Sequence, residues 1–445
     1  MTNRKAQARQ AFDAQVEAWG VEAFEAGASS FPEFLARLPG VYPAVALDAL
    51  YRLQRSGRVS VDLSSSLERQ PRSDGHVAPI VLSPLPPPHP LDFEWRFTKR
   101  AANELLSVAQ TLAKPDDRVV LLGTPAVAAV ATVAPIDRAT VFIGEDNPIT
   151  GAVVVMNILN GRPLLVQACN PQTLLPKEAG VVIVDPPWYF DFLRPMLAAA
   201  ASSCRAGGFV LLSLLPIGTR PGAAQERARI IRYLQGLSLE IAEMKERALA
   251  YETPFFEANA LAAAGLNSIP GDWRRSDLLV LRKKRSLDRP LVFRAPQKHW
   301  HETMVGRMRL FVSRSERKMP LSGPVIQSLL PGDILPSVSR RDSRRRKAQV
   351  WTSGNRIFAS QRPDIVLAAA MRAGNGKGAS LATHGHLSNT ERDELNRLSY
   401  ALLTLAEKEE AEEYPSPVLE APCLSEDSTS NSIASSLTSR TTVFG

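Results

Sequence analysis

The residues best suited to chemistry lie at the end of a short apolar run, where an acid is followed by two prolines and two aromatics: Asp185, Pro186, Pro187, Trp188 and Tyr189. The β-branched residues before Asp185 favour a buried strand, and a proline cannot continue the sheet, so the chain must leave the sheet there. The Asp185 carboxylate and the Pro186 carbonyl can then accept both hydrogens of an amino group. Such acceptors favour a tetrahedral nitrogen with an available lone pair, while Trp188 or Tyr189 can stack on a flat ring. The pattern indicates group transfer onto nitrogen; the alternative is a Pro-Pro turn with aromatics that only pack.

Alternating strand and helix patterns surround this motif. Strands are expected at 118–123, 140–146, 164–169, 181–185 and 208–213, helices at 99–112, 126–134 and 192–204, and a closing antiparallel pair at 237–250 and 277–282. Thr98 is the expected N-cap of the first helix. This order predicts an α/β fold with a doubly wound, Rossmann-like sheet over residues 92–285.

The segment Asp185-Pro186-Pro187-Trp188 resembles the catalytic motif of the amino-methyltransferases, class I enzymes that modify adenine or cytosine amino groups in DNA and RNA. The resemblance implies that these four residues are catalytic and that the cofactor is S-adenosyl-L-methionine. In class I methyltransferases an acid at the end of the second strand binds the cofactor ribose, which makes Glu145 or Asp146 the candidate. Asn170, after the third strand, is the candidate contact of the adenine ring.

The expected cofactor turn departs from the family pattern. It is reduced to residues 122–125, with one glycine where the family commonly has two or three. Gly123 and Thr124 are the candidate cofactor contacts, and Pro125 can begin a helix whose N-terminus faces the cofactor carboxylate. A plain strand-to-helix turn is the alternative.

An insertion between the last two predicted strands, residues 252–273, lies beside the acceptor pocket in this fold. Phe255, Phe256 and Trp273, together with Tyr189, are candidates for gripping a flat acceptor. Aromatics that pack the insertion down are the alternative.

Composition bounds the setting of the protein. The 445 residues carry a formal charge of +8, which suggests an anionic partner. No apolar run approaches the length needed to span a bilayer and no apolar signal core follows the first residues, which predicts a cytoplasmic protein that does not contact membranes. The three cysteines are widely separated and lack metal-ligand spacing, and the two His-x-His segments have no acid or cysteine cluster near them in sequence, so neither a disulfide framework nor a metal site is predicted. The sequence predicts no oligomeric state.

The densest basic run, residues 339–347, precedes an aromatic and hydroxyl-bearing segment at 350–356. Arginines in such a setting can bind phosphates and stack on bases, whereas a charged solvated loop is the alternative. The candidate nucleic-acid-binding residues are Arg340, Arg341, Arg344, Arg345, Arg346 and Lys347.

Further regions flank the catalytic one. In residues 1–63, helices expected at 31–38 and 44–55 precede a segment at 57–63, an order that resembles a winged helix-turn-helix with Arg52, Arg55 and Arg58 towards DNA. Protein binding or dimerisation is the alternative there. Residues 64–91 predict a Pro/Ser-rich linker, 286–370 a basic β-containing appendage, 371–414 a C-terminal helix with a capping signature, and 415–445 a disordered tail.

Three functions fit these patterns. Methyl transfer to an exocyclic amino nitrogen, first of all that of adenine in DNA or RNA, accounts for the motif, the basic run and the N-terminal module together. Branched-polyamine synthases resemble the layout too; they transfer an aminopropyl group to a cationic acceptor, which calls for an acidic pocket. The third function is a degenerate methyltransferase fold that serves as a nucleic-acid or protein-binding module, which the reduced glycine turn keeps open.

Overall fold

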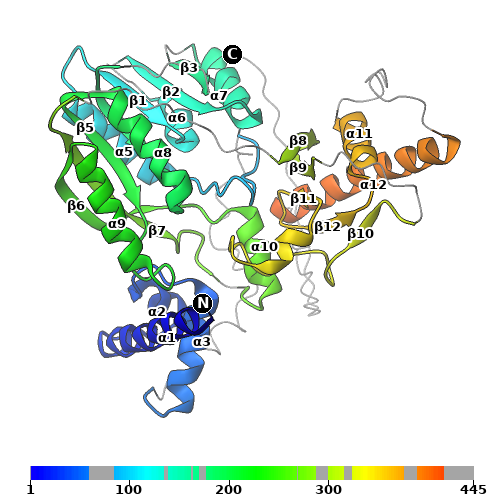
Figure 1. Cartoon of the computed structure of the whole chain (residues 1–445), viewed down its shortest axis with the longest axis horizontal. Coiled ribbons are helices and arrows are strands. Elements are labelled where there is room, and N and C mark those ends of the chain that lie inside the picture. The colour runs from blue at the N-terminus through cyan, green and yellow to red at the C-terminus, as the bar shows by residue number, and fades with distance from the viewer. Residues whose placement is uncertain are drawn as a thin grey trace, which may run out of the picture.

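A computed structural model describes residues 2–59, 85–134, 139–161, 164–169, 177–267, 269–286, 299–314, 323–374 and 388–414. These residues form N-terminal helices, a central sheet covered by helices, and a second sheet with two helices (Figure 1). Among them, no helix is both long and apolar enough to cross a membrane.

The central sheet has seven strands in the order β3-β2-β1-β4-β5-β7-β6. The strands β1 to β5 are parallel, and β7 runs antiparallel to both of its neighbours. Their bounds are β1 Arg118–Leu122, β2 Thr140–Glu145, β3 Leu165–Cys169, β4 Ala179–Val184, β5 Cys204–Leu214, β6 Leu239–Ala250 and β7 Arg275–Lys283. This mostly parallel sheet fits a Rossmann-like methyltransferase fold, which confirms the predicted α/β class.

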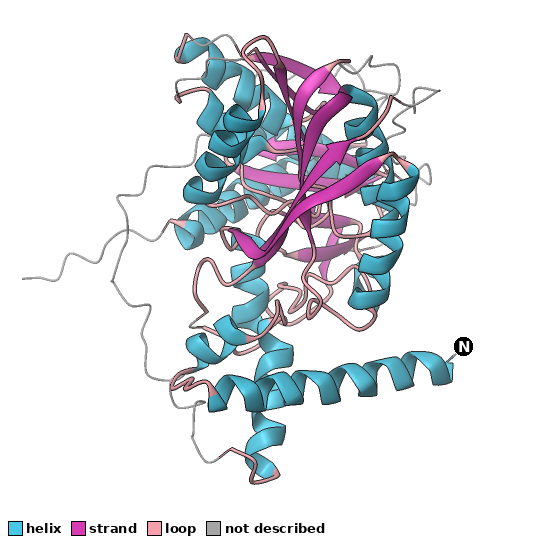
Figure 2. Cartoon of the chain, turned by 90° about the vertical axis from the view of Figure 1, so that its left-hand side faces the viewer, coloured by secondary structure: helices cyan, strands magenta, loops and turns pink. Residues whose placement is uncertain are grey.

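Helices cover both faces of this sheet (Figure 2). They are α5 Lys99–Leu112, α6 Pro125–Ala131 and α7 Pro148–Leu159 on one face, and α8 Phe190–Ser203 and α9 Ala223–Gly236 on the other. Every residue of β4 is buried; Val181 and Ile183 pack towards α5 and α6, whereas Val182 and Val184 pack towards α8 and α9. Two-sided burial explains the unbroken apolar run before Asp185.

Local signals at the start of α5 and α12 behave as the sequence indicated. The Thr98 side chain accepts a hydrogen bond from the Ala101 amide and caps α5. Ser388 and Glu391 form a capping box at the start of α12, Asn389–Glu413. The helices α7, α9 and α10, Phe255–Ala263, were not expected.

The N-terminal helices are α1 Thr2–Glu25, α2 Phe31–Arg37 and α3 Pro43–Arg55. The helices α2 and α3 match the two predicted ones, but α1 packs along α3 and Glu17 accepts hydrogen bonds from Arg52 at 2.7 Å and Arg58 at 2.6 Å. Two of the three arginines expected to face DNA therefore share one acidic partner on α1. Most of the expected wing, residues 60–63, lies outside the described residues.

The C-terminal sheet is antiparallel, with the order β10-β12-β11-β9-β8. Its strands are β8 Trp300–Val305, β9 Met308–Ser313, β10 Ile326–Ser328, β11 Val350–Thr352 and β12 Ile357–Ser360. The helices α11, Pro363–Gly374, and α12 share one core with this sheet. The predicted boundary at residue 370 therefore falls inside α11, because helix and sheet bury each other.

The segment before α5 is packed rather than extended as a linker. His89 is fully buried and its ring stacks on Phe311 of β9, with 4.0 Å between centroids. Arg309, also of β9 and fully buried, pairs with Asp92 and with Glu302. The last part of the predicted linker is therefore packed: Leu85 lies in the core of the central sheet, and His89 and Leu91 pack against the C-terminal sheet. Residues 64–84 lie outside the described residues.

Candidate functional site

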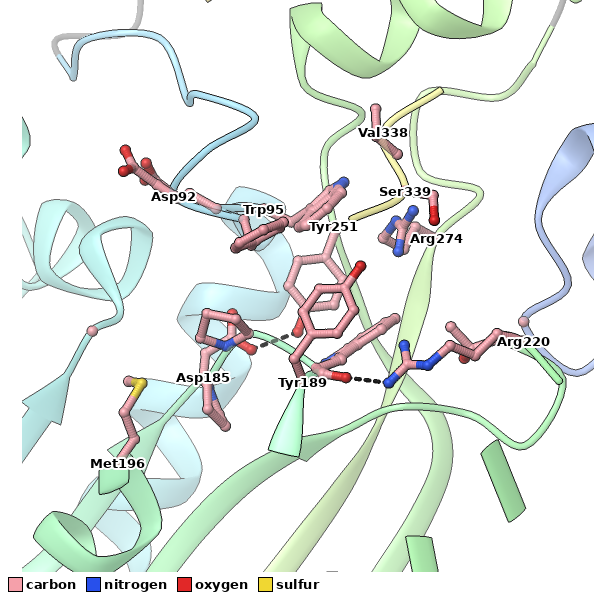
Figure 3. Close-up of a pocket in the computed structure, with 18 of the residues that line it drawn as sticks. Asp92, Trp95, Asp185, Tyr189, Met196, Arg220, Tyr251, Arg274, Val338 and Ser339 are labelled. Atoms are coloured by element: carbon pink, nitrogen blue, oxygen red, sulfur yellow. Dashed lines mark hydrogen bonds between the residues drawn. The ribbon is translucent and has the colours of Figure 1, made fainter. Parts of the chain in front are cut away.

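A cavity of about 1100 Å³ lies at the carboxyl ends of the central strands (Figure 3). Ligands of open α/β sheets bind at this edge. Strand ends supply one wall with Gly123, Glu145 and Asp185; the N-terminal helices add Phe12 and Tyr42, and residues 337–339 of the C-terminal region close another side. All three parts of the molecule thus contribute to one site.

The five motif residues, Asp185 to Tyr189, all line this cavity. Asp185 directly follows β4, and Tyr189 precedes the first turn of α8. The two prolines carry the chain from the buried strand to the helix, as expected from their inability to extend the sheet. The structure thus places the predicted catalytic segment at the ligand-binding edge.

Two hydroxyl groups hold the Asp185 carboxylate. The Tyr251 hydroxyl donates to Asp185 Oδ1 at 2.8 Å, and the Ser213 hydroxyl donates to the same oxygen. The two hydroxyl oxygens lie 2.8 Å apart, and both side chains are buried. Within the described residues no hydrogen bond reaches Oδ2, so that oxygen keeps its capacity to accept from a ligand.

Burial raises the pKa of Asp185 to about 7. The hydrogen bonds from Ser213 and Tyr251 lower it, and the nearby negative charge of Glu94 raises it further. The carboxyl is therefore ionised above pH 7 and protonated below, which places its titration near neutrality.

The two aromatic residues of the motif differ in their surroundings. Trp188 meets Tyr251 edge to face, with 5.8 Å between ring centroids. The Tyr189 ring has the guanidinium carbons of Arg220 and Arg340 at 5.1 Å and 5.4 Å from its centroid. Arg220 also donates to the carbonyl of Trp188, which fixes the turn (Figure 3).

The predicted cofactor turn lies directly beside Asp185, because Leu122 of β1 pairs with Val184 of β4. Gly123 has a φ of +64°, a conformation that favours glycine, and a Cβ there would lie 2.7 Å from the terminal methyl of Met196. Thr124 is buried behind this wall, and its Oγ1 has no hydrogen-bond partner among the described residues. Of the two acids after β2, Glu145 lines the cavity and Asp146 does not. Asn170 lies outside the described residues.

The predicted acceptor-binding aromatics of the insertion, residues 252–273, do not all reach the cavity. Trp273 lines the cavity, whereas Phe255 and Phe256 begin α10 and are absent from its lining. Phe256 is fully buried and packs against Trp95, with 5.5 Å between centroids. The packing alternative therefore describes Phe256.

The basic run includes a short 3₁₀ helix, η1 Ser343–Lys347, and most of its arginines have partners within the chain. Arg340 pairs with Asp191 at 2.6 Å, and Arg344 pairs with Asp342 at 2.6 Å. Paired arginines of this kind support the loop rather than present a free charge.

The remaining members of the run differ from one another. Arg341 lines the cavity, and Arg345 stacks on Trp351 with 4.3 Å from its guanidinium carbon to the ring centroid. Burial lowers the pKa of Arg345 to about 10. Arg346 and Lys347 are exposed, as Arg340 and Arg341 are, but they form no ion pair with the described residues. The exposed pair is the part of the run with the geometry for a solvent-facing phosphate contact.

Sequence reasoning missed several residues of this site: Ser213, Tyr251, Glu94, Arg274 and Glu257. Ser213 ends a strand that the sequence predicted, and parallel strands bring their carboxyl ends to one edge, so its position was within reach of the pattern. Tyr251 directly follows β6, an antiparallel strand whose register has irregularities. Nothing local in the sequence pairs it with Asp185.

The described residues contain no group of three or more His, Cys, Asp or Glu side chains arranged to hold a metal ion.

No protein-family model matches the chain, and no curated protein matches it. Among solved structures, a branched-chain polyamine synthase mutein from Thermus thermophilus is 15% identical, covers 65% of this chain and 94% of its own, and has a TM-score of 0.48. A putative RNA methyltransferase from Pyrococcus horikoshii is 15% identical, covers 44% of this chain and 90% of its own, and has a TM-score of 0.33. TrmN from Thermus thermophilus is 18% identical, covers 41% and 48%, and has a TM-score of 0.28. These likenesses are distant, and the strand order of the central sheet remains the basis for its fold.

Proposed function

We propose that the protein is an S-adenosyl-L-methionine-dependent methyltransferase that acts on an exocyclic amino nitrogen, that of adenine in nucleic acid before others. The observation that carries this proposal is the Asp185 carboxylate, fixed through Oδ1 by Ser213 and Tyr251 at the edge of a cavity that extends to Gly123 and Glu145.

The residues at the Gly123 end fit a sulfonium nucleoside. The positive φ of Gly123 and its lack of a side chain let the backbone approach a ligand closely. Glu145, at the end of β2, supplies a carboxylate for vicinal hydroxyls. Apolar walls from Leu122 and Ile143 suit a flat base. The cofactor supplies a methyl group on a positively charged sulfur.

Directly beside Gly123, two groups of the motif are placed to hold the acceptor nitrogen. Asp185 Oδ2 and the Pro186 carbonyl accept its two hydrogens, which directs its lone pair towards the bound cofactor. S-adenosyl-L-methionine would supply the methyl group to that lone pair, and its sulfur would keep the electrons of the broken S–C bond. The nitrogen then loses one proton, and the Asp185 carboxylate, with a pKa of about 7, can receive it and pass it to solvent.

Aminopropyl transfer to a polyamine is the second candidate, because Asp92 and Glu94 also line the cavity. Their charge is only partly compensated: Asp92 and Glu302 share Arg309, and Glu94 accepts from Arg96 at 2.8 Å while its Oε2 has no hydrogen-bond partner among the described residues. The lining also carries four arginines, Arg9, Arg220, Arg274 and Arg341, so the cavity is not the acidic pocket that a cationic acceptor calls for. Methyl transfer therefore remains the first candidate.

Calorimetric titration with S-adenosyl-L-methionine and with its decarboxylated analogue tests the proposal. We expect the first to bind, and labelled cofactor then to transfer its methyl group to a DNA or RNA pool. Labelling of spermidine by the decarboxylated analogue would support the second candidate instead. Binding of neither compound would overturn both, and would favour a methyltransferase fold that serves as a binding module.

A further inference from the structure

Three tryptophans of the cavity surround one arginine. The guanidinium carbon of Arg274 lies 4.5 Å from the ring centroid of Trp95, 4.8 Å from that of Trp273 and 5.5 Å from that of Trp188. All four side chains line the cavity, and Arg274 is only 9% exposed (Figure 3). We call these three rings the tryptophan cage. Such cages commonly bind ammonium groups of ligands, but this one is filled by a cation of the protein itself.

A buried acid fixes that cation in place. Arg274 Nη2 donates to Glu257 Oε1 at 2.7 Å, and Trp95 Nε1 donates to Glu257 Oε2 at 2.8 Å. Glu257 is fully buried, and its two oxygens accept from Arg274 and Trp95 respectively. Removal of Arg274 would leave this charge buried without a partner, and the arginine is therefore a permanent part of the wall.

Two donors in the same wall lack acceptors. Arg274 Nε and Trp273 Nε1 are buried, and neither has a hydrogen-bond partner among the described residues. Buried N–H groups without partners are unfavourable, and few occur in folded proteins. Both side chains line the cavity, so a small rotation of either would bring its N–H to an acceptor of a bound ligand.

We infer that Arg274 and Trp273 determine the class of acceptor: they donate to the hydrogen-bond-accepting edge of a flat, neutral ring, and Arg274 keeps ammonium groups out of the tryptophan cage. This inference rests on the proposed function and deepens it. Amino-bearing nucleobases carry a ring nitrogen or carbonyl next to the amino group and so offer such an edge. A polyamine offers only donors and positive charge, which neither unpaired N–H can use, and the Arg274 guanidinium already occupies the place of an ammonium group among the three rings.

The test measures binding to the full-length protein, separately from transfer. Tryptophan fluorescence and saturation-transfer NMR follow titrations with 2′-deoxyadenosine, 2′-deoxycytidine and spermidine, each in the presence of S-adenosylhomocysteine. We expect one of the two nucleosides to bind saturably, and spermidine to bind at least tenfold more weakly. Equal or tighter binding of spermidine would overturn the inference.

Two variants test the residues themselves. Trp273→Phe keeps a ring but removes one donor, and we expect it to weaken nucleoside binding about fivefold. The matched control is Trp300→Phe, since Trp300 lies outside the cavity lining; it should leave binding unchanged. The double variant Arg274→Gln, Glu257→Gln removes the internal cation and its partner acid together, and we expect spermidine binding to gain at least tenfold.

The outcomes separate this inference from the proposed function. Failure of the wild-type protein to bind S-adenosylhomocysteine would overturn the proposed function. If that compound binds but Trp273→Phe leaves the nucleoside affinity unchanged, the acceptor-edge assignment is wrong. Near-ultraviolet circular dichroism establishes whether the double variant is folded. If the folded double variant gains no affinity for spermidine, the exclusion role of Arg274 is wrong. If the double variant does not fold, the result for Trp273→Phe decides the inference.

Discussion

The two ends of the cavity are built differently. At the acceptor end, side chains from distant segments fix one another: Asp185 is held by Ser213 and Tyr251, and Arg274 by Glu257. At the cofactor end, the geometry comes from a backbone turn at Gly123. A side chain with two hydroxyl partners is preorganised for a proton-bearing nitrogen, whereas a glycine turn provides only room and shape. We therefore expect changes at the acceptor end to alter the rate, and changes at the cofactor end to alter affinity.

The largest effect is expected for Asp185→Ala, a change at the acceptor end. It removes the acceptor of the amino hydrogens, so we expect kcat to fall by about 100-fold or more, while the Kd for S-adenosyl-L-methionine changes less than about threefold. Labelled methyl transfer and calorimetry measure the two quantities. Asp116→Ala, at an exposed position outside the cavity lining, is the matched control. Retained activity in Asp185→Ala would refute the role of this carboxylate.

The converse variant is Gly123→Ala. A side chain at φ +64° introduces strain of about 1–3 kcal/mol, and the Met196 methyl at 2.7 Å must move. We expect the cofactor Kd to rise about tenfold, with kcat at saturating cofactor close to that of wild type. Gly151→Ala, on α7 where a Cβ meets nothing within 4 Å, is the control. A fall in kcat with unchanged Kd would reverse the comparison.

The rate of methyl transfer should depend on pH through the titration of Asp185. Transfer requires the Asp185 carboxylate, so the rate should rise with pH through an inflection near 7. Ser213→Ala removes a hydrogen bond that lowers this pKa, and the inflection should move about one pH unit to the alkaline side with the plateau retained. Single-turnover rates between pH 5 and 9 measure it, with Ser107→Ala as control. An inflection that does not move would show that Ser213 leaves the carboxyl unaffected.

The same pKa has a consequence for stability. The native state holds the Asp185 proton more tightly than the unfolded state, whose aspartates titrate near 3.9. This carboxyl thus contributes stability below about pH 4, and the contribution is lost as pH rises through about 7. The free energy of unfolding of Asp185→Asn, measured relative to that of wild type, should therefore be about 1–3 kcal/mol higher at pH 8 than at pH 4. Urea unfolding at the two pH values measures the difference, and an equal effect at both would contradict it.

Much of the sheet and the motif position could be predicted from the sequence, because buried parallel strands leave unbroken apolar runs that end where the chain turns. Asp185 and Glu145 were found in this way. Ser213 could have been placed at the same edge, because it ends a predicted strand. Tyr251 could not, since it follows an antiparallel strand with an irregular register. The same holds for Arg309, whose pairing with Asp92 depends on how the C-terminal sheet docks.

Amphipathic and basic patterns were less informative than apolar ones. A charged residue shows no sign in sequence of whether its partner is solvent, nucleic acid or another side chain. Arg52 and Arg58 were expected to face DNA, yet both pair with Glu17 of α1. Arg340 and Arg344 likewise have acids beside them. Only the structure separates these from Arg346 and Lys347.

The smallest effect is expected for Arg346 and Lys347, the two basic residues of the run without an ion pair to the described residues. If nucleic acid follows the acceptor end of the cavity towards η1, Arg346→Ala and Lys347→Ala together should weaken binding of a single-stranded oligonucleotide only a few-fold. The slope of log K against log salt should become shallower by about 0.7 for each phosphate that the protein no longer neutralises. Arg397→Ala, which removes an exposed charge from α12, should leave the slope unchanged. Fluorescence anisotropy across a salt series measures this. A slope unaffected by the double variant, with kcat retained, would confine acceptor recognition to the cavity itself, where Trp188, Trp273 and Arg274 act on a single base.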